Sequence, residues 1–339
     1  MLDSKMPIKV SIIVPCYNER PTIYLLLDAL YEQTYPQSAI EVIIADGGST
    51  DGTRQAITEW HTAHPDLEIM VIDNPDRTIP AALNAAIKTS SSEIIIRLDA
   101  HARPHPTYVE RILAALSEGR GQNVGGAWDI HPGRDHWVAR SIAAAASHPI
   151  GVGDALYRHS DQAAYVDTVP FGAFNRKLLD QVGMFDETLL TNEDYEFNTR
   201  IRQSGGKIWF DPQIRSIYYA RPDLKALARQ YWRYGYWKVQ MLRRYPATIR
   251  WRQALPPLFV VTLIVLLLLA PFLILAQWFL SALTGIYLFI LLLAGLQLAI
   301  KHGEGAMIIG VPTAIATMHF TWGTGFLWGL FVPQKQNKG

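Results

Sequence analysis

The sequence predicts an α/β fold, in which a doubly wound and mostly parallel sheet is followed by an α-helical membrane region. Two observations lead to this prediction. Within the first hundred residues, three short apolar runs each end in a cluster of polar side chains. After about residue 253, charged side chains almost disappear from the chain. The first observation indicates the sheet, and the second indicates the membrane region.

The three apolar runs are expected to be parallel strands. They span residues 10–15, 42–45 and 94–98 and are rich in Ile and Val. Parallel strands buried on both faces read as continuous apolar runs rather than as alternating ones. The polar clusters that follow them are residues 16–19, 46–51 and 99–101. Because the carboxyl ends of parallel strands open on one edge of a sheet, these clusters predict a ligand site at that edge.

Helices are expected between the strands. Residues 23–31 have a helical pattern, and residues 55–60 follow possible capping residues at positions 49–51. Residues 69–72 indicate a further short strand. Thr78 can cap the next helix, with Pro80 in its first turn, where proline is tolerated. The resulting βαβαβαβ order predicts the doubly wound sheet, but many unrelated enzymes share that order, so it does not assign a function.

Composition and missing motifs exclude several classes of function. The formal net charge is +1, which gives no reason to expect a nucleic-acid partner. Cys16 is the single cysteine, which excludes an intrachain disulfide and a multi-cysteine zinc site. Residues 1–9 have no apolar segment, so we expect no secretory signal. The first strand is followed neither by a glycine-rich dinucleotide turn nor by a Walker motif, which argues against Rossmann dehydrogenases and P-loop hydrolases.

The C-terminal third is expected to enter a membrane. Residues 253–300 contain no Asp, Glu, Lys or Arg, and a hydrocarbon core needs about 20 apolar residues to span. Residues 257–276 and 281–300 are therefore predicted as two spans. Residues 306–332 are a third span or a re-entrant hairpin, because glycines and a proline interrupt them. We expect a catalytic domain over 1–220, interfacial amphipathic helices over 221–252, the membrane region over 253–334 and a tail over 335–339.

Basic residues next to the first predicted span indicate its orientation. Arg243, Arg244, Arg250 and Arg252 immediately precede it, and basic residues near spans favour the cytoplasmic side. We therefore expect a multi-pass protein of the cell inner (cytoplasmic) membrane, with the N-terminal domain in the cytoplasm.

The acidic strand ends indicate a particular ligand chemistry. Asp46 can accept a hydrogen bond from a base or a sugar, although on its own it could equally be a turn residue beside Gly47 and Gly48. Asp99 stands where a carboxylate could hold a divalent ion. Mg²⁺ is usually held by one or two carboxylates together with substrate phosphates. These residues therefore indicate a nucleotide that carries a diphosphate.

The same clusters, in order and spacing, resemble the motifs of the family 2 glycosyltransferases of GT-A fold. The resemblance rests on residues 11–19, 44–53 and 98–101, and it continues through 171–174, 182–187 and 192–196. It covers about residues 8–240. Within the family, residues 99–102 and the short membrane region are most similar to the succinoglycan-type glucosyltransferases of exopolysaccharide assembly.

The resemblance implies a role for each matching position at the donor end of the site. The donor nucleoside, usually uridine in this family, would be held by Pro15, Tyr17, Glu19 and Asp46, with Asp46 facing the base. Asp51 would support the same loop.

The resemblance also implies a metal and a base. Asp99 would bind Mg²⁺ or Mn²⁺ on the donor diphosphate, and His101, where most relatives have a second acid, would be the other metal ligand or a phosphate contact. Asp194 would be the general base in a single displacement that inverts the configuration of the sugar. The alternative for Asp194 is an ordinary acid in the first turn of a helix that Asn192 caps.

Five further positions are expected to contact the diphosphate or the acceptor. They are Arg77, Asn84, Glu193, Gln230 and Arg233. For Arg77 and Asn84 a structural role is an equal alternative. Gln230 and Arg233 match part of a Gln-x-x-Arg-Trp motif of membrane-bound synthases, but Tyr234 replaces the tryptophan. The segment that contains them also has the composition of a membrane-surface helix.

The implied function is metal-dependent, inverting transfer of a hexose from a nucleotide diphosphate sugar, in the first place a UDP-sugar, to a lipid-linked glycan. The transfer would take place at the cytoplasmic face of the lipid bilayer, in exopolysaccharide or cell-surface glycan assembly. Alternatives within enzymes are a polyisoprenyl-phosphate sugar synthase and a processive polysaccharide synthase. The non-enzymatic alternative is a membrane-docked regulator that binds nucleotide sugars.

Overall fold

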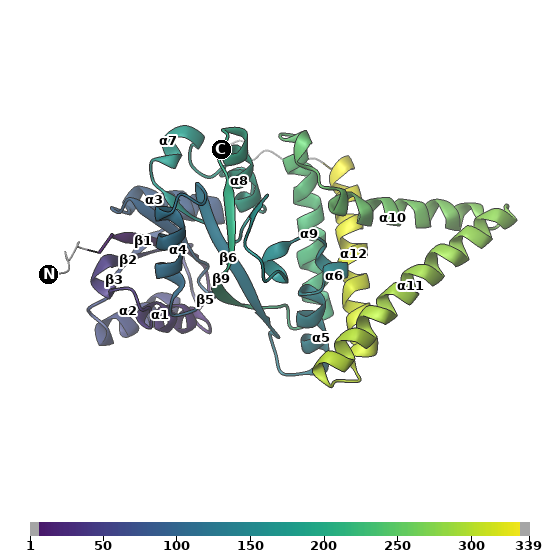
Figure 1. The fold of residues 1–339 in the computed structure, drawn as a ribbon, viewed down its shortest axis with the longest axis horizontal. Helices are drawn as coiled ribbons and strands as arrows, with labels where there is room; N and C mark the ends of the chain where they lie inside the picture. Colours follow the sequence, from purple (N-terminus) through teal and green to yellow (C-terminus); the bar gives the residue numbers. More distant parts are fainter. Residues whose placement is uncertain (1–6, 333–339) are drawn as a thin grey trace. The chain divides into compact units, whose positions relative to one another are not determined.

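The computed structural model describes residues 7–332, which form two compact units (Figure 1). The sheet unit contains the described residues up to 129 together with residues 160–218. The helical unit contains residues 130–159 and the described residues from 219 onward. Residues 130–159 thus group with the C-terminal helices rather than with the rest of residues 1–220. The expected tail, residues 335–339, lies outside the described residues.

The sheet unit is built on a mixed sheet with the strand order β3-β2-β1-β4-β8-β6-β9-β5, in which β7 also pairs with β9. The strands are β1 (Val10–Cys16), β2 (Ile40–Asp46), β3 (Glu68–Asp73), β4 (Ile94–Arg97), β5 (Arg103–Pro104), β6 (Asn123–His131), β7 (Ala164–Val166), β8 (Ala173–Asn175) and β9 (Ile208–Tyr219). β1 pairs in parallel with β2 and β4, and β2 pairs in parallel with β3. β8 then joins β4 in the antiparallel sense and extends the sheet. The parallel part predicted from the apolar runs is confirmed.

Helices connect the parallel strands as expected. The helices of the sheet unit are α1 (Ile23–Tyr31), α2 (Thr53–Ala63), α3 (Ile79–Thr89), α4 (Tyr108–Ser117), α7 (Leu178–Val182) and α8 (Glu193–Gln203), with a short 3₁₀ turn at Gln37–Ala39. The Thr78 hydroxyl accepts a hydrogen bond from Ala81 N at the start of α3, which confirms the predicted cap. At α2 the cap position is instead Gly52, in the left-handed region at φ 91°, and no side chain caps from that position.

The core of the sheet unit explains why the apolar runs are continuous. Ile12, Val14, Val42 and Ile44 on the central strands are fully buried, and Leu27 of α1 packs with them in one cluster. Burying a side chain of this size contributes about 1.5–3 kcal/mol. The core therefore fixes β1 and β2 in register, and with them the loops that follow both strands.

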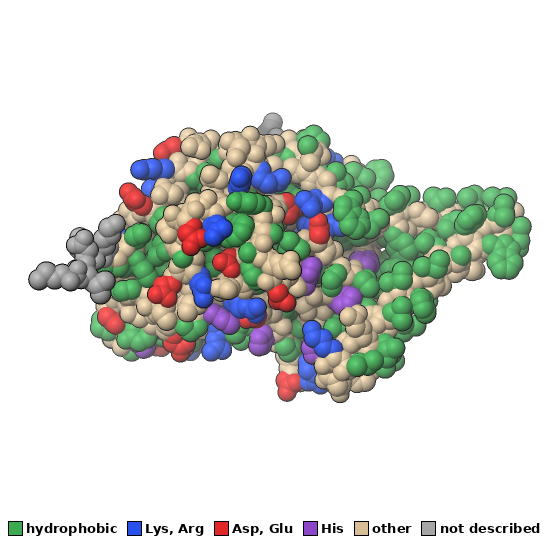
Figure 2. Space-filling view, in the orientation of Figure 1, with side chains coloured by type: hydrophobic (Ala, Val, Ile, Leu, Met, Phe, Trp, Pro, Cys, Tyr) green, Lys and Arg blue, Asp and Glu red, His purple; other side chains and the backbone are tan. Residues whose placement is uncertain are grey.

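The helical unit consists of α5 (Trp137–Ala146), α6 (Pro149–Val152), α9 (Leu224–Leu242), α10 (Trp251–Leu269), α11 (Ile274–His302) and α12 (Met307–Phe331), with 3₁₀ turns at Leu156–Arg158 and Pro246–Thr248. Among the described residues, α10 and α11 are long and apolar enough to cross a membrane, and their most apolar windows are only 11% and 17% buried. Figure 2 shows hydrophobic side chains gathered over these two helices.

The predicted boundaries of the two spans were wrong. We expected the first span to run from 257 to 276, but α10 ends at Leu269 and α11 begins at Ile274. Pro271 lies in the turn between them, where it costs no helical hydrogen bond because proline has no backbone N–H to donate. The expected break between residues 276 and 281 is continuous helix in α11.

The third apolar segment is one continuous helix, α12, rather than a hairpin, and it is not among the candidate spans found in residues 7–332. Its glycines serve close packing instead of chain reversal. A Cβ on Gly323 would lie 2.7 Å from Pro256 O of α10, and one on Gly329 would lie 3.1 Å from Tyr236 O of α9. Any larger side chain at Gly323 would push α10 and α12 apart.

Candidate active site

The ends of three parallel strands meet in register at one edge of the sheet. In the β1–β2 ladder Cys16 lies opposite Asp46, and in the β2–β3 ladder Asp46 lies opposite Asp73. The loops after β1 and β2 are joined by two hydrogen bonds, from Asn18 N to Ser49 Oγ at 2.8 Å and from Thr50 N to the Asn18 side chain at 2.9 Å. The polar clusters predicted after β1 and β2 are therefore joined to one another at this edge.

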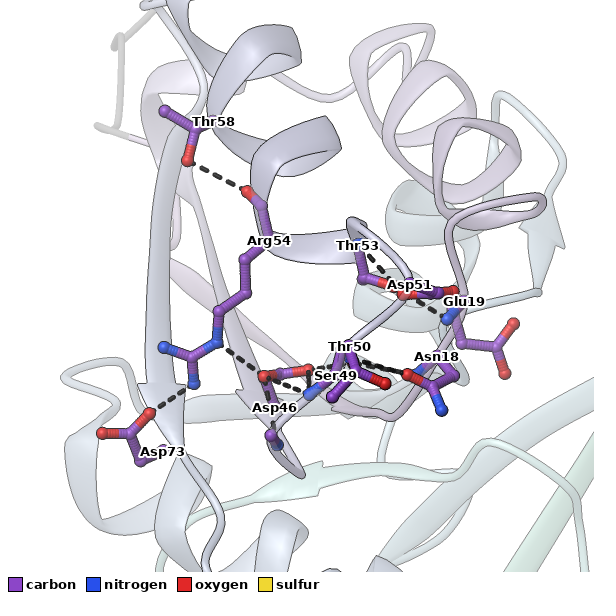
Figure 3. Close-up of polar contacts among 11 residues, drawn as sticks. Asn18, Glu19, Asp46, Ser49, Thr50, Asp51, Thr53, Arg54, Thr58 and Asp73 are labelled. Carbon is purple, nitrogen blue, oxygen red and sulfur yellow. Dashed lines mark hydrogen bonds and ion pairs between the residues drawn. The ribbon is translucent and has the colours of Figure 1, made fainter.

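Asp46 is a buried acid at this edge of the sheet, and Figure 3 draws its polar contacts. Its side chain is fully buried, and it accepts hydrogen bonds from Ser49 N at 3.1 Å, Gly48 N at 3.2 Å and Arg54 Nε at 2.6 Å. Burial by itself would raise the pKa of this carboxyl, but the hydrogen bonds from Ser49 and Arg54 outweigh burial and hold the pKa below its ordinary value. Asp46 is therefore ionised, and protein groups already occupy its two oxygens.

Arg54 was not predicted as part of this site. Its guanidinium, from the first turn of α2, pairs with both Asp46 and Asp73 and so joins the ends of β2 and β3 (Figure 3). The available signal was a basic residue in the first turn of the helix that follows an acidic strand end. Arg54 places a positive charge beside the expected base-binding aspartate.

Replacing Asp46 by asparagine is expected to lower stability in a pH-dependent way. Because the pKa of the folded carboxyl is depressed, its contribution is complete above the unfolded pKa of about 3.9 and is lost as pH falls through the folded value. Hydrogen bonds to a charged group contribute about 1.5–3 kcal/mol, so we expect a loss of that order at pH 7. Thermal unfolding in detergent between pH 3 and 7 measures it, and the difference from wild type should shrink toward pH 3.

Asp161→Asn, at an exposed loop position of the same unit, is the control for this measurement. It should leave the unfolding temperature unchanged at every pH. A constant difference between Asp46→Asn and wild type from pH 7 to pH 3 would contradict the assigned role of the Asp46 charge.

Asp51 fixes the loop that follows β1. Its carboxylate accepts hydrogen bonds from Arg20 N at 3.1 Å and from Thr53 N at 3.0 Å, and the Thr53 hydroxyl in turn accepts from Glu19 N at 2.9 Å. The geometry matches the supporting role expected for Asp51. Pro15, on β1, lies opposite Ala45 of β2 in the same ladder.

Tyr17 and Arg77 lie together on the surface of this edge. The Tyr17 side chain is 49% exposed, and the Arg77 guanidinium is 5.9 Å from the centre of its ring. Arg77 has a backbone φ of 55°, in the left-handed region that non-glycine residues seldom adopt. An exposed aromatic ring and a neighbouring cation are suited to a planar base or a phosphate.

Asn84 has a structural role in this structure. Its side chain is 4% exposed, donates to Phe185 O at 2.9 Å and to Glu187 Oε1 at 2.7 Å, and accepts from Phe185 N at 3.0 Å. The side chain is thus used to hold the loop before α8, and of the two alternatives for Asn84 the structural one describes these contacts.

Asp99 and His101 lie just beyond the end of β4. Their side chains are 25% and 40% exposed, and His101 Nδ1 lies 3.1 Å from Glu19 Oε1. Among residues 7–332, no group of three or more His, Cys, Asp or Glu side chains is arranged to hold a metal by itself. One carboxylate and one imidazole, both open to solvent, nevertheless fit a Mg²⁺ or Mn²⁺ ion whose remaining ligands come from a diphosphate.

Arg97 contacts both Asp99, the expected metal ligand, and Asp194, the predicted base. It is the last residue of β4, its side chain is 4% exposed, and one guanidinium nitrogen lies 3.3 Å from Asp99 and 2.9 Å from Glu193. The other terminal nitrogen pairs with Asp194. Asp99 and Asp194, far apart in the sequence, therefore contact the same guanidinium. The sequence signal that we overlooked is an arginine directly after three isoleucines in a buried strand.

Glu193 and Asp194 begin α8. Asn192 precedes them with φ 70° in the left-handed region, and its side chain forms no capping hydrogen bond. Asn192 therefore stands at the cap position of α8, as expected, but it makes no side-chain hydrogen bond to the helix. Asp194 is instead held through Arg97, and its side chain is 29% exposed. This exposure leaves the carboxylate accessible to a substrate.

Gln230 and Arg233 lie on α9 of the helical unit. Gln230 is 8% exposed, and its side-chain nitrogen donates to the Tyr234 hydroxyl at 2.9 Å, whereas Arg233 is exposed. Tyr234, which replaces the tryptophan of the expected motif, thus contacts Gln230 of the same motif. The roles of Gln230 and Arg233 in the site stay predictions.

Comparison with known proteins identifies similar chains along nearly the whole length. The family model described as "Glycosyl transferase family 2" matches residues 11–183. The chain is 28% identical to the Methanococcus voltae dolichyl N-acetyl-alpha-D-glucosaminyl phosphate 3-beta-D-2,3-diacetamido-2,3-dideoxy-beta-D-glucuronosyltransferase, over 95% of this chain and 97% of that protein. It is 29% identical to the succinoglycan biosynthesis protein ExoA of Rhizobium meliloti, over 93% of each.

A solved structure shows the same fold. It is the mannosyltransferase PcManGT of Pyrobaculum calidifontis in complex with GDP-Man and Mn²⁺, with a TM-score of 0.63 and 23% identity. The match covers 98% of this chain and 90% of that one. The likeness confirms the GT-A type of sheet that was predicted, followed by C-terminal helices.

Proposed function

The chain belongs to glycosyltransferase family 2, and from this premise we propose that it transfers a hexose from a nucleotide diphosphate sugar to a lipid-linked glycan. The observation that supports this most directly is the meeting of Asp99 and Asp194 at Arg97. In this proposal Asp99 would hold a cation for the donor diphosphate, and Asp194 would take the proton of the acceptor hydroxyl. A site with both groups can bind a donor and deprotonate an acceptor.

The donor would lie along the edge formed by β1, β2 and β4. The nucleoside is assigned to the loop after β1 and to the surface of Tyr17 and Arg77. Asp46, whose oxygens are held by protein donors, contributes its charge and the shape of this loop. The mannosyltransferase of similar fold is in complex with GDP-Man, which supports a nucleotide sugar as the donor. The donor screen below therefore includes both UDP- and GDP-sugars.

A divalent ion bound with the donor would be held by Asp99 and His101, and it would neutralise charge on the departing diphosphate as a Lewis acid. The residues of the chain perform the remaining work. Arg97 holds Asp99 in place, and Glu19 Oε1 lies 3.1 Å from His101 Nδ1 and can accept a hydrogen bond from its imidazole N–H.

In the transfer step, the Asp194 carboxylate accepts the proton of the acceptor hydroxyl. The acceptor oxygen forms a bond to the anomeric carbon as the bond from that carbon to the diphosphate oxygen breaks. The electron pair of the broken bond leaves with the nucleoside diphosphate. Attack from the face opposite the leaving group inverts the configuration in one displacement.

The acceptor is proposed to reach the site from a membrane. α10 and α11 are the two candidate spans. Arg243, Arg244 and Arg250 precede α10, and basic residues next to a span favour the cytoplasmic side of the membrane. The name of the Methanococcus relative describes a dolichyl-phosphate-linked sugar as its acceptor, and that of ExoA describes succinoglycan synthesis. We infer a lipid-linked glycan acceptor at the cytoplasmic face, in exopolysaccharide or cell-surface glycan assembly.

A donor screen tests this function. The purified full chain is incubated with UDP- and GDP-sugars and a membrane lipid extract, and release of nucleoside diphosphate is measured with and without EDTA. We expect release with a subset of donors, dependence on the lipid extract, and loss of release with EDTA. Bare polyisoprenyl phosphate as the acceptor tests for the polyisoprenyl-phosphate sugar synthase alternative. That enzyme would join the sugar directly to the phosphate of the lipid. Absence of release with every donor would contradict the proposal.

A further inference from the structure

Arg97 is a buried cation surrounded by the acids of the site. It follows Ile94, Ile95 and Ile96 on β4, and its side chain is only 4% exposed. The carboxylates of Asp99, Glu193 and Asp194 all contact its guanidinium. A buried charge is costly unless it is paired, so these three acids stabilise the guanidinium in the interior.

The contacts of Arg97 use the planar shape of the guanidinium. One terminal nitrogen serves Asp99 and Glu193, at 3.3 and 2.9 Å, and the other pairs with Asp194. A lysine ammonium could neutralise these acids, but as a single point it could not hold two of them at fixed positions on different nitrogens. The geometry therefore needs arginine for its fork and not only for its charge.

We propose that Arg97 is a positioning residue that sets Asp194 relative to Asp99, and so sets the acceptor hydroxyl relative to the donor diphosphate. This inference rests on the proposed function, because it assigns Asp99 to the donor end and Asp194 to the acceptor end. Arg97 itself touches neither substrate. It acts by holding two carboxylates, which come from the end of β4 and the start of α8, in one arrangement.

A purely structural ion pair is the competing explanation, and the same unit offers a matched control. Arg176, which follows β8, donates hydrogen bonds to Ser92 O at 3.0 Å, Ile87 O at 2.9 Å and Ser90 O at 2.8 Å. These bonds connect the end of β8 to the segment between α3 and β4. These partners are backbone carbonyls outside the site. Arg176→Met should therefore lower stability and leave the chemical step unchanged.

The test compares Arg97→Lys and Arg97→Met with Arg176→Met in the full-length protein. Arg97→Lys keeps the buried charge, so we expect it to fold and to bind UDP–Mn²⁺ or GDP–Mn²⁺ within about threefold of wild type by calorimetry. Its kcat should fall about 100-fold, because a displacement of about 1 Å costs that much. The acceptor KM should change little. Arg97→Met, where it folds, should lose at least as much kcat.

The outcomes separate this inference from the proposed function. Turnover by wild type together with an unchanged kcat for Arg97→Lys would overturn the inference alone. A kcat loss in Arg176→Met equal to that in Arg97→Lys, measured below both unfolding temperatures, would also overturn it, because a general loss of structure would then explain both. A wild-type protein that turns over no donor would overturn the proposed function and this inference with it. A kcat loss confined to the Arg97 variants, with nucleotide binding retained, would support the inference.

Discussion

Asp194→Asn is expected to abolish sugar transfer and to leave nucleotide binding intact. The asparagine amide is close in shape to the carboxylate but cannot accept the proton of an acceptor hydroxyl. General base catalysis contributes about 10²–10⁴-fold, so kcat should fall by about that factor. The donor binds at the ends of β1, β2 and β4, and calorimetric affinity for a nucleoside diphosphate with Mn²⁺ should stay within about threefold of wild type.

The matched control for Asp194 lies on the same helix. Glu196 of α8 is 1% exposed and pairs with Arg200 at 2.6 Å. Glu196→Gln should therefore lower the unfolding temperature and preserve kcat, which is the reverse of the expected result for Asp194→Asn. If Asp194→Asn turns over at the wild-type rate with the acceptor identified in the donor screen, the base is another residue.

The strand ends could be predicted because their signal is local. A continuous apolar run identifies a buried parallel strand, and the polar residue that ends it must lie at the sheet edge. Asp46 and Asp99 were found in this way, and the register of β1 with β2 and β4 confirms the arrangement. Thr78 was equally local, since a cap depends on residues within one helical turn.

Arg54 and Arg97 could not be assigned because their partners are distant in sequence or lie on another element. Arg54 is a surface residue of α2 by composition, and its pairing with Asp73 depends on the β2–β3 register. Arg97 interrupts an apolar strand, which alone indicates an edge or a bulge as readily as a buried cation. Its guanidinium pairs with Glu193 and Asp194 only because the start of α8 lies beside the end of β4 in the folded chain.

The membrane region shows the opposite limitation. Hydropathy identified the apolar stretches, but it did not place the turn, because a window average does not register a turn that lies within an apolar stretch. In the third segment, glycines predicted a possible chain reversal. The structure uses Gly323 for contact with α10, and that role depends on a neighbouring helix. Composition therefore predicted the class of the region, whereas its connectivity depended on individual residues.

Asp99→Ala is expected to abolish metal-dependent binding of the nucleotide. Asp99 and His101 fit only part of a coordination shell, and no cluster of three or more ligating side chains exists among the described residues to compensate for a loss. Loss of an outer-shell partner of a metal ligand already costs about 10–100-fold in affinity, so removal of the carboxylate itself should cost at least about 100-fold. Calorimetry with UDP or GDP in the presence of Mn²⁺ measures this effect.

The decisive comparison for Asp99 is with chelation. If the Asp99 carboxylate acts by holding the ion, removing either the carboxylate or the ion removes the same interaction, so their effects should not add. EDTA should weaken nucleotide binding to wild type by the same factor as Asp99→Ala, and EDTA should have no further effect on the variant. Asp161→Asn, an exposed acid of the same unit, should respond to EDTA as wild type does. Nucleotide binding to Asp99→Ala that remains tight and still responds to EDTA would mean that another group holds the ion.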